Sequence, residues 1–266
     1  MMRLICVWLL CLALVLGPGI TSPAAAAAPV KLEDLQYRLS LGWLGEVALV
    51  HLTLTRVGPE RYHAQFTGAA QGVWSLLQRW LPESYESEMA LDGGRLKPLL
   101  YREKFHSQGK NISKEYRFDY TRQVLEIWRG VDGREAVLDW QGPLKGPVYD
   151  PLTLFYNLRL GAVGPVVPGQ TLKVDLVPNP DPRQMVLNIG PKTGEGRKVM
   201  IFVTSKAGGK DGPYFIFANS QKVPLLAWIR VLAFGKLSGR LLNPGEIMKG
   251  GLAPAGQISA KPEAKR

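Results

Sequence analysis

A repeated alternation of apolar and polar residues, broken by turns rich in Gly and Pro, constrains the fold of this chain more than any other feature. Over residues 35–41 every second side chain is apolar, and residues 48–54 repeat the pattern after a short turn. This period of two is typical of a strand that buries one face. The pattern recurs with turn signals about every 8 to 12 residues, which indicates antiparallel strands joined by hairpins.

The same reasoning predicts the remaining elements. Further strands are expected over residues 62–66, 96–105, 112–120, 124–129, 135–140, 172–177, 185–189, 198–204 and 214–217, and a strand pair over 223–242. Helical spacing occurs over residues 73–80, which Pro82 ends, and over residues 152–160. About ten short strands and only two short helices predict a mostly β fold, an antiparallel barrel or a strongly curved half-barrel.

The two ends of the chain have compositions of their own. Arg3 precedes an apolar run and a cluster of Ala residues, so residues 1–26 are expected to be a secretory signal peptide. Residues 27–242 are predicted to form a single β-barrel-like domain. Residues 243–266 are rich in Gly, Pro, Ala and Lys and are expected to be a disordered basic tail.

Export follows from this organisation. We expect a soluble periplasmic protein with no transmembrane segment in the mature chain, because the apolar run of the signal is shorter than the roughly 20 residues that span a bilayer. A lipid anchor is not expected, since Leu10 before Cys11 is larger than lipoprotein processing prefers. Cys6 and Cys11 are the only cysteines, so the mature chain would have neither disulfides nor a cysteine nucleophile.

The charge balance bears on the partners. The sequence has 33 Lys and Arg residues against 22 Asp and Glu residues, a net charge of +11. Such a balance favours anionic partners, and for an exported protein a lipid or an anionic envelope polymer is more plausible than nucleic acid. The basic residues are scattered along the chain, so a generally basic surface without a specific partner is the alternative.

Residues 150–159 carry the clearest local signals. Asp150 is expected to cap a helix, Pro151 to occupy its first position and Gly161 to end it. Asp150 and Asp119 are therefore interpreted as structural hydrogen-bond acceptors or as partners of Arg159 or Arg117.

Several segments, in their order and spacing, resemble a known family. They are Tyr37-Arg38-Leu39-Ser40, Gly42-Trp43-Leu44-Gly45-Glu46, Tyr116-Arg117-Phe118-Asp119, Asp150-Pro151-Leu152-Thr153, Tyr156-Asn157-Leu158-Arg159 and Val223-Pro224-Leu225-Leu226. These segments resemble a family of exported bacterial proteins known as domain of unknown function 3108. The resemblance implies an all-β, barrel-like domain of the periplasm or cell surface, and it implies no established activity.

The sequence contains no pattern that points to catalysis. It has no Gly-x-Ser-x-Gly, no His-Glu-x-x-His and no phosphate-binding loop. His51, His63 and His106 fall at polar positions or strand ends, where exposure explains them. If they lay on a strand, Glu86 and Glu88 would share one face as neighbours, which is common among exposed acids. We therefore expect no enzymatic activity, no metal site and no cofactor.

Binding is the function that the sequence favours. A curved sheet with a helix across its mouth can enclose an apolar pocket for a lipidic or amphiphilic envelope component. Tyr156, Arg159 and Trp43 are the predicted ligand contacts, with Arg159 meeting an anionic head group. The alternative is a structural protein with a filled core that binds an envelope protein or anionic cell-wall polymer through its basic surface. The sequence leaves the oligomeric state open.

Overall fold

The fold is described from a computed structural model, which covers residues 28–70, 82–177, 183–193, 196–203, 214–218, 222–231 and 235–243. The first eight strands are β1 (Val30–Leu41), β2 (Glu46–Gly58), β3 (Arg61–Ala70), β4 (Pro82–Asp92), β5 (Arg95–Ser107), β6 (Lys110–Asp119), β7 (Val124–Val131) and β8 (Val137–Pro143). The remaining strands are β9 (Val148–Tyr149), β10 (Thr171–Leu176), β11 (Arg183–Thr193), β12 (Gly196–Val203), β13 (Tyr214–Ala218), β14 (Pro224–Val231) and β15 (Gly235–Leu241). The helical elements are the 3-10 turn η1 (Gly42–Leu44) and the α-helix α2 (Pro151–Leu160).

All fifteen strands belong to one sheet, ordered β8-β7-β6-β5-β4-β3-β2-β1-β15-β14-β13-β12-β11-β10-β9. Strands β1 to β8 form one meander, and the last strand, β15, pairs antiparallel with the first, β1. Within the described residues β8 and β9 stand at the two ends of this order, so the sheet is open. The expected curved antiparallel sheet is thus present without barrel closure, and the two-residue strand β9 pairs parallel with β10.

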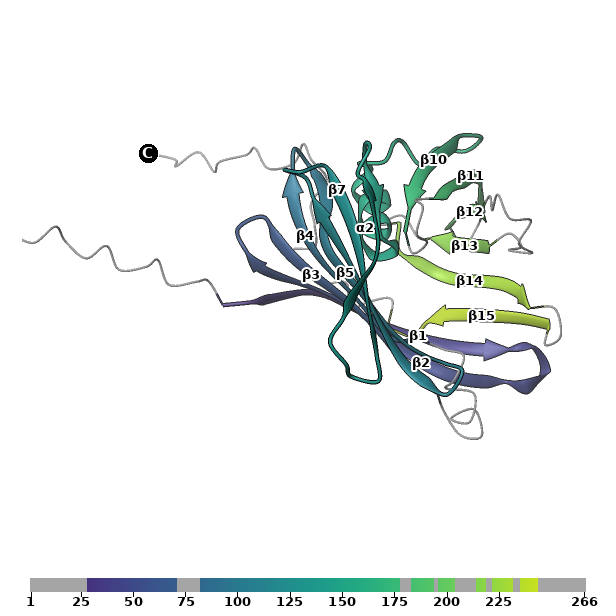
Figure 1. Ribbon diagram of the computed structural model, residues 1–266. Helices are drawn as coiled ribbons and strands as arrows, with labels where there is room; N and C mark the ends of the chain where they lie inside the picture. Colours follow the sequence, from purple (N-terminus) through teal and green to yellow (C-terminus); the bar gives the residue numbers. More distant parts are fainter. Residues whose placement is uncertain are drawn as a thin grey trace, which may run out of the picture.

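The sheet bends so that its two halves face each other, and helix α2 lies in the angle between them (Figure 1). Leu152 and Tyr156 of α2 pack against Leu35, Leu52 and other apolar residues of β1 to β5. Leu154 of the same helix packs with residues of β10 and β11. The helix therefore joins the cores of the two halves.

Most of the predicted strands are confirmed, but β4 was missed. The sequence interpretation placed no strand before the turn at 92–94, although Tyr85, Ser87 and Met89 alternate with polar or small residues, and Ser87 and Met89 are fully buried. This strand is central, since it pairs with both β3 and β5 over most of its length. This alternation could have predicted the strand. It was passed over because the preceding residues 73–80 were interpreted as a helix that Pro82 ends.

Lys114 is the one polar residue in the inward-facing apolar stripe of β6, and a buried acid lies opposite it. Its cross-strand neighbour on β5 is Glu103, whose side chain is 6% exposed. The bulge between β4 and β5 leaves Leu99 unpaired and turns Tyr101 and Glu103 to the inner face. The buried acid thus lies opposite a basic side chain on the neighbouring strand.

Some predictions concern parts of the chain outside the described residues. These are the signal peptide, the first expected helix at 73–80 and the tail from residue 244 onwards; α2 is the one α-helix within the described residues. Asn243, which was assigned to the tail, is instead bound to β1. Its side chain accepts from the backbone N–H of Gln36 at 2.8 Å and donates to the carbonyl of Asp34 at 2.8 Å.

Candidate functional site

The segment 150–159 builds and anchors α2 as its sequence predicts at the N-terminus. The carboxylate of Asp150 accepts from the backbone N–H groups of Leu152 and Thr153, both at 2.9 Å, and Pro151 occupies the first turn. Gly161 ends the helix in the left-handed conformation at a φ of 79°. Asp150 is fully buried, and its second oxygen accepts from the Ser87 hydroxyl at 2.8 Å, which fixes the start of the helix to β4. Burial raises the pKa of Asp150, while its hydrogen bonds act in the opposite direction.

Asn157 fastens the middle of the helix to the sheet. Its side-chain oxygen accepts from the backbone N–H of Leu96 at 2.9 Å, and its amide donates to the carbonyl of the same residue at 2.8 Å. Asn157 is fully buried. Asn157 thus bonds both the backbone N–H and the backbone carbonyl of Leu96, and this pair of hydrogen bonds fixes the position of α2 over β5.

Tyr156 and Arg159, two of the three predicted ligand contacts, face Glu33 on β1. The Arg159 guanidinium donates to the Glu33 carboxylate at 2.6 Å, and the Tyr156 hydroxyl lies 3.3 Å from the same oxygen. Glu33 is 2% exposed and Tyr156 is 1% exposed. Sequence patterns could not pair these residues, because Glu33 and Arg159 are 126 positions apart. The positive charge of Arg159 is therefore already matched by a buried carboxylate.

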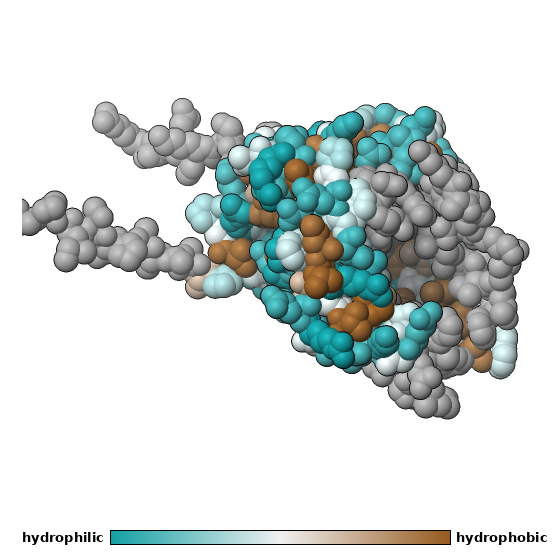
Figure 2. All heavy atoms as spheres, viewed as in Figure 1, coloured by the Kyte–Doolittle hydropathy of each residue, from teal (hydrophilic) through white to brown (hydrophobic). Residues whose placement is uncertain are grey.

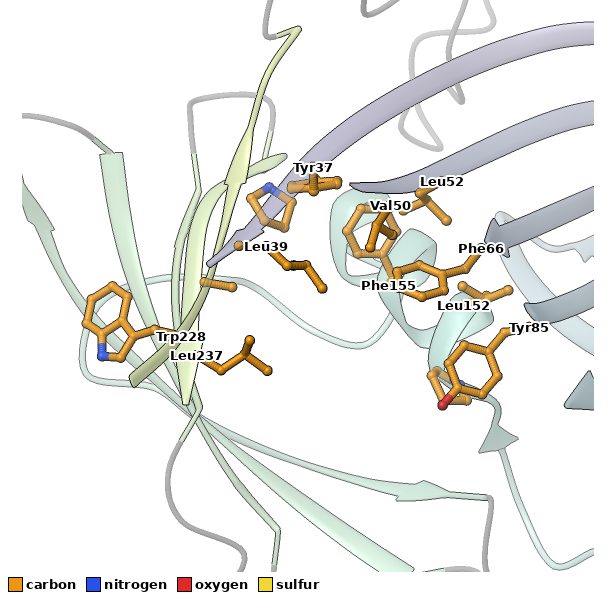
Figure 3. Close-up of a pocket in the computed structure, with 14 residues that line it drawn as sticks. Tyr37, Leu39, Val50, Leu52, Phe66, Tyr85, Leu152, Phe155, Trp228 and Leu237 are labelled. Atoms are coloured by element: carbon orange, nitrogen blue, oxygen red, sulfur yellow. The ribbon is translucent and has the colours of Figure 1, made fainter. Parts of the chain in front are cut away.

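A cavity of about 390 Å³ lies between α2 and the sheet, next to this ion pair. Its walls come from both halves of the sheet and from one face of the helix. The lining residues are Tyr37, Leu39, Val50, Leu52, Phe66, Tyr85, Pro151, Leu152, Phe155, Pro224, Ala227, Trp228, Leu237 and Gly239. In Figure 3, Phe155 and Leu152 of the helix face Phe66 and Leu52, while Leu39 and Leu237 extend from the opposite side.

The chemistry of this lining is almost uniformly apolar. None of the lining residues carries a charge at neutral pH, whereas the outer face in Figure 2 is largely hydrophilic. Tyr37 contributes to the walls, but its hydroxyl is buried away from the open space and has no hydrogen-bond partner among the described residues. Burial, followed by the nearby Glu33 carboxylate, raises the pKa of Tyr37. The site is suited to holding an apolar molecule.

The other predicted site residues lie elsewhere. Trp43 is 86% exposed in η1 and does not line the cavity. Asp119 accepts from the backbone N–H of Arg122 at 2.8 Å and from its side chain, and these bonds lower its pKa. Asp119 is a structural acceptor as expected, but its basic partner is Arg122, and Arg117 pairs instead with Glu115.

The residues considered for catalysis lie near oppositely charged side chains on the outer face of the sheet. Glu86 and Glu88 do share a face of β4, where Arg102 lies 4.0 Å from the first carboxylate and 2.9 Å from the second. His51 has 46% of its side chain exposed and lies 3.8 Å from Asp34. No group of three potential metal ligands occurs among the residues that the structure describes. Over the same residues, no helix is long and apolar enough to cross a membrane.

Fold and site together define a curved, mostly antiparallel β protein with a helix-covered apolar pocket. The chain belongs to the family described as Protein of unknown function (DUF3108), whose family model matches residues 36–200, and this confirms the resemblance. Among solved structures it is similar to a beta-barrel-like protein of domain of unknown function DUF1849 from Brucella abortus. That similarity has 11% identity and a TM-score of 0.45 and covers 80% of this chain and 97% of the other. No curated protein matches the chain.

Proposed function

We propose that this protein binds a lipidic or amphiphilic component of the bacterial envelope in the cavity beneath α2. The observation that carries the proposal is the cavity itself, about 390 Å³ of space lined by fourteen residues that carry no charge. Ligand pockets in proteins are commonly about 300 to 1,000 Å³ and mostly apolar, with a few placed polar groups. The signal-like N-terminus supports an exported location for this activity.

A filled core is the alternative that the cavity argues against. A closed hydrophobic core is packed with few voids larger than a water molecule. Here Tyr156 of α2 is packed in the core, yet Leu152 and Phe155 of the same helix border open space. The helix therefore has one face that stabilises the fold and another face available for a ligand.

Chain length gives a quantitative test of apolar binding. Each methylene that moves from water into an apolar site contributes about 0.8 kcal/mol, so affinity is expected to rise about fourfold per methylene. We would measure displacement of the neutral fluorophore N-phenyl-1-naphthylamine by a homologous series of methyl esters. The rise is expected to continue until the cavity is full and then to stop. Affinity that does not depend on chain length would contradict burial of the chain.

A cavity-filling variant locates the binding site. Ala227 lines the cavity from β14, so Ala227→Trp is expected to occupy the space and to lower ester affinity at least tenfold. The matched control is Ala69→Trp on β3, because Ala69 is exposed and outside the lining. Lipid extraction and mass spectrometry of the purified protein identify any bound ligand. Equal binding by both variants would remove the cavity as the site.

A further inference from the structure

We infer that the end of the sheet that carries Trp43 docks on an anionic membrane surface, with Trp43 at the lipid interface and a basic patch beside it facing the head groups. The basic patch consists of Arg38, Lys236 and Arg240. The inference goes beyond the proposed function, because it concerns the outside of the molecule and not the cavity. Two separate observations support it: a tryptophan that the fold leaves 86% exposed, and like charges placed opposite each other on paired strands.

Trp43 is held at the tip of the sheet by a tight turn between β1 and β2. The backbone N–H of Leu41 donates to the carbonyl of Gly45 at 2.9 Å, and the positive φ of 75° at Gly45 leads the chain into β2. The start of β15 lies against this turn, since a Cβ placed on Gly235 would be 3.9 Å from the Cα of Gly42. Figure 1 shows the end of β1 and the start of β15 side by side. An exposed tryptophan on such a turn suits a membrane interface, where its ring is buried and its indole N–H stays hydrated.

The basic patch lies next to this tip, on the outer face of the seam where β15 pairs with β1. Leu39 and Leu237 line the cavity from these two strands. Side chains alternate along a strand, so the residues of the basic patch point to the opposite, outer face. Arg38 and Arg240 are direct partners in the β1–β15 register. Like charges at such positions repel each other, and an anionic surface relieves this cost.

The basic patch has few acids to offset it. Glu46 pairs with Arg38 at 3.0 Å, and both side chains remain partly exposed. Lys236 lies 4.4 Å from the centre of the Trp228 ring. Although Trp228 borders the cavity, in Figure 3 its ring extends from β14 away from the other labelled residues, so this cation belongs to the outer face. In the part of the chain that the structure describes, neither Lys236 nor Arg240 pairs with an acid. Three cations against one acid leave the patch positive.

Flotation with lipid vesicles tests the docking surface. The protein is purified after export by a bacterial host and mixed with vesicles of equal parts phosphatidylcholine and phosphatidylglycerol, or of phosphatidylcholine alone. The wild type is expected to bind the anionic vesicles at least tenfold more tightly than the neutral ones at about 0.1 M salt. Most of this binding is expected to be lost at about 1 M salt, where the Debye length falls to about 3 Å.

A double substitution with a matched control isolates the basic patch. Lys236→Gln combined with Arg240→Gln is expected to weaken binding to the anionic vesicles at least tenfold, since each basic residue near such a surface contributes about fivefold. Arg56→Gln combined with Arg61→Gln removes the same charge from two exposed residues at the opposite end of β2. This control is expected to weaken binding less than about twofold, because screening limits the effect of distant charges.

Trp43→Ala isolates the aromatic contribution. The variant is expected to bind the anionic vesicles about fivefold to tenfold more weakly, because it loses the burial of an apolar ring at the interface. Val137→Ala is its control, because Val137 is 65% exposed on β8, at one end of the strand order. It is expected to bind as the wild type does. Both substitutions are at exposed positions, so both variants are expected to fold.

The outcomes separate docking from cavity binding. Ala227→Trp is expected to float with the anionic vesicles as the wild type does, and the double variant of the basic patch is expected to keep its affinity for methyl esters. If Ala227→Trp loses vesicle binding, the lipid is held through the cavity and the docking surface is wrong. If Trp43→Ala floats as the wild type does, or if both double variants are weakened equally, the surface binds polyanions in general and the membrane inference is wrong. The proposed function would stand in each of these cases.

Discussion

Replacing Glu103 with Gln is expected to stabilise this protein at neutral and alkaline pH and to have little effect in acid. Glu103 lies on the inner face of β5 with 6% of its surface exposed. Burial raises its pKa from an ordinary value of 4.5 to about 7, although Lys114 across the strand pair lowers it. The cost of burying the carboxylate therefore exceeds the benefit of its basic neighbour.

The sign and size follow from proton linkage. Between pH 4.5 and about 7, folded Glu103 holds a proton that the unfolded chain has released. The folded state thus binds more protons, and the free energy of unfolding falls as the pH rises, by up to about 1.4 kcal/mol per pH unit. Over the whole interval Glu103 is expected to remove about 3 kcal/mol of stability. At pH values below 4.5 the contribution is fully retained, and above about 7 it is fully lost.

Urea unfolding, followed by tryptophan fluorescence from pH 4.5 to 8, measures this effect. Glu103→Gln imitates the protonated acid, so the difference between wild type and variant cancels the titration of most other groups. The variant is expected to match the wild type at pH 4.5 and to exceed its stability by about 3 kcal/mol at pH 8. Glu88→Gln is the control on the outer face of β4, where 46% of the side chain is exposed. That exchange is expected to cost less than about 1 kcal/mol.

Either of two results would refute this reasoning. If the stability of Glu103→Gln relative to the wild type is constant with pH, the pKa of Glu103 is the same in the folded and unfolded chain. If the wild type instead gains stability over the variant as the pH rises, the Lys114 ammonium outweighs desolvation. The buried pair would then be a stabilising salt bridge.

Further substitutions test how α2 is held and whether the exposed Trp43 contributes, each by urea unfolding of the purified chain. Arg159→Met is expected to destabilise the fold by about 3 to 5 kcal/mol, because it leaves the buried carboxylate of Glu33 without its cation; adding Glu33→Gln is expected to restore part of the loss. Asn157→Ala is expected to cost about 3 kcal/mol, since both polar groups of Leu96 lose their partner. Trp43→Ala, at an 86% exposed position, is expected to change stability by no more than about 0.5 kcal/mol and to leave ligand affinity unchanged.

Local patterns predicted the elements well, because the responsible physics acts between residues close in sequence. The alternation at 35–41 gave β1, and Asp150 with Gly161 gave both ends of α2, as the hydrogen bonds of the caps confirm. The main failure among the strands, β4, occurred where a Pro after a helical spacing was interpreted as a helix end and the strand that it begins was not assigned.

The candidate site was predicted less well, because it is built from contacts distant in sequence. The predicted helix borders the cavity, but Phe155 and Leu152 line it, while Tyr156 and Arg159 face Glu33. Which side of a ten-residue helix meets a buried acid on β1 depends on how the helix is docked. The Asn157 contact with Leu96 sets that docking, and periodicity within either segment carries no information about it.

The pairing of β15 with β1 has a consequence for the order of folding. Contacts across this seam join residues up to 209 positions apart, such as Asn243 and Asp34, so they close late and slowly in comparison with the hairpins of the meander. The cavity takes its walls from both sides of the seam, with Leu39 from β1 and Leu237 from β15. The cavity therefore forms only when this seam closes, and a ligand bound in it would stabilise the closed seam.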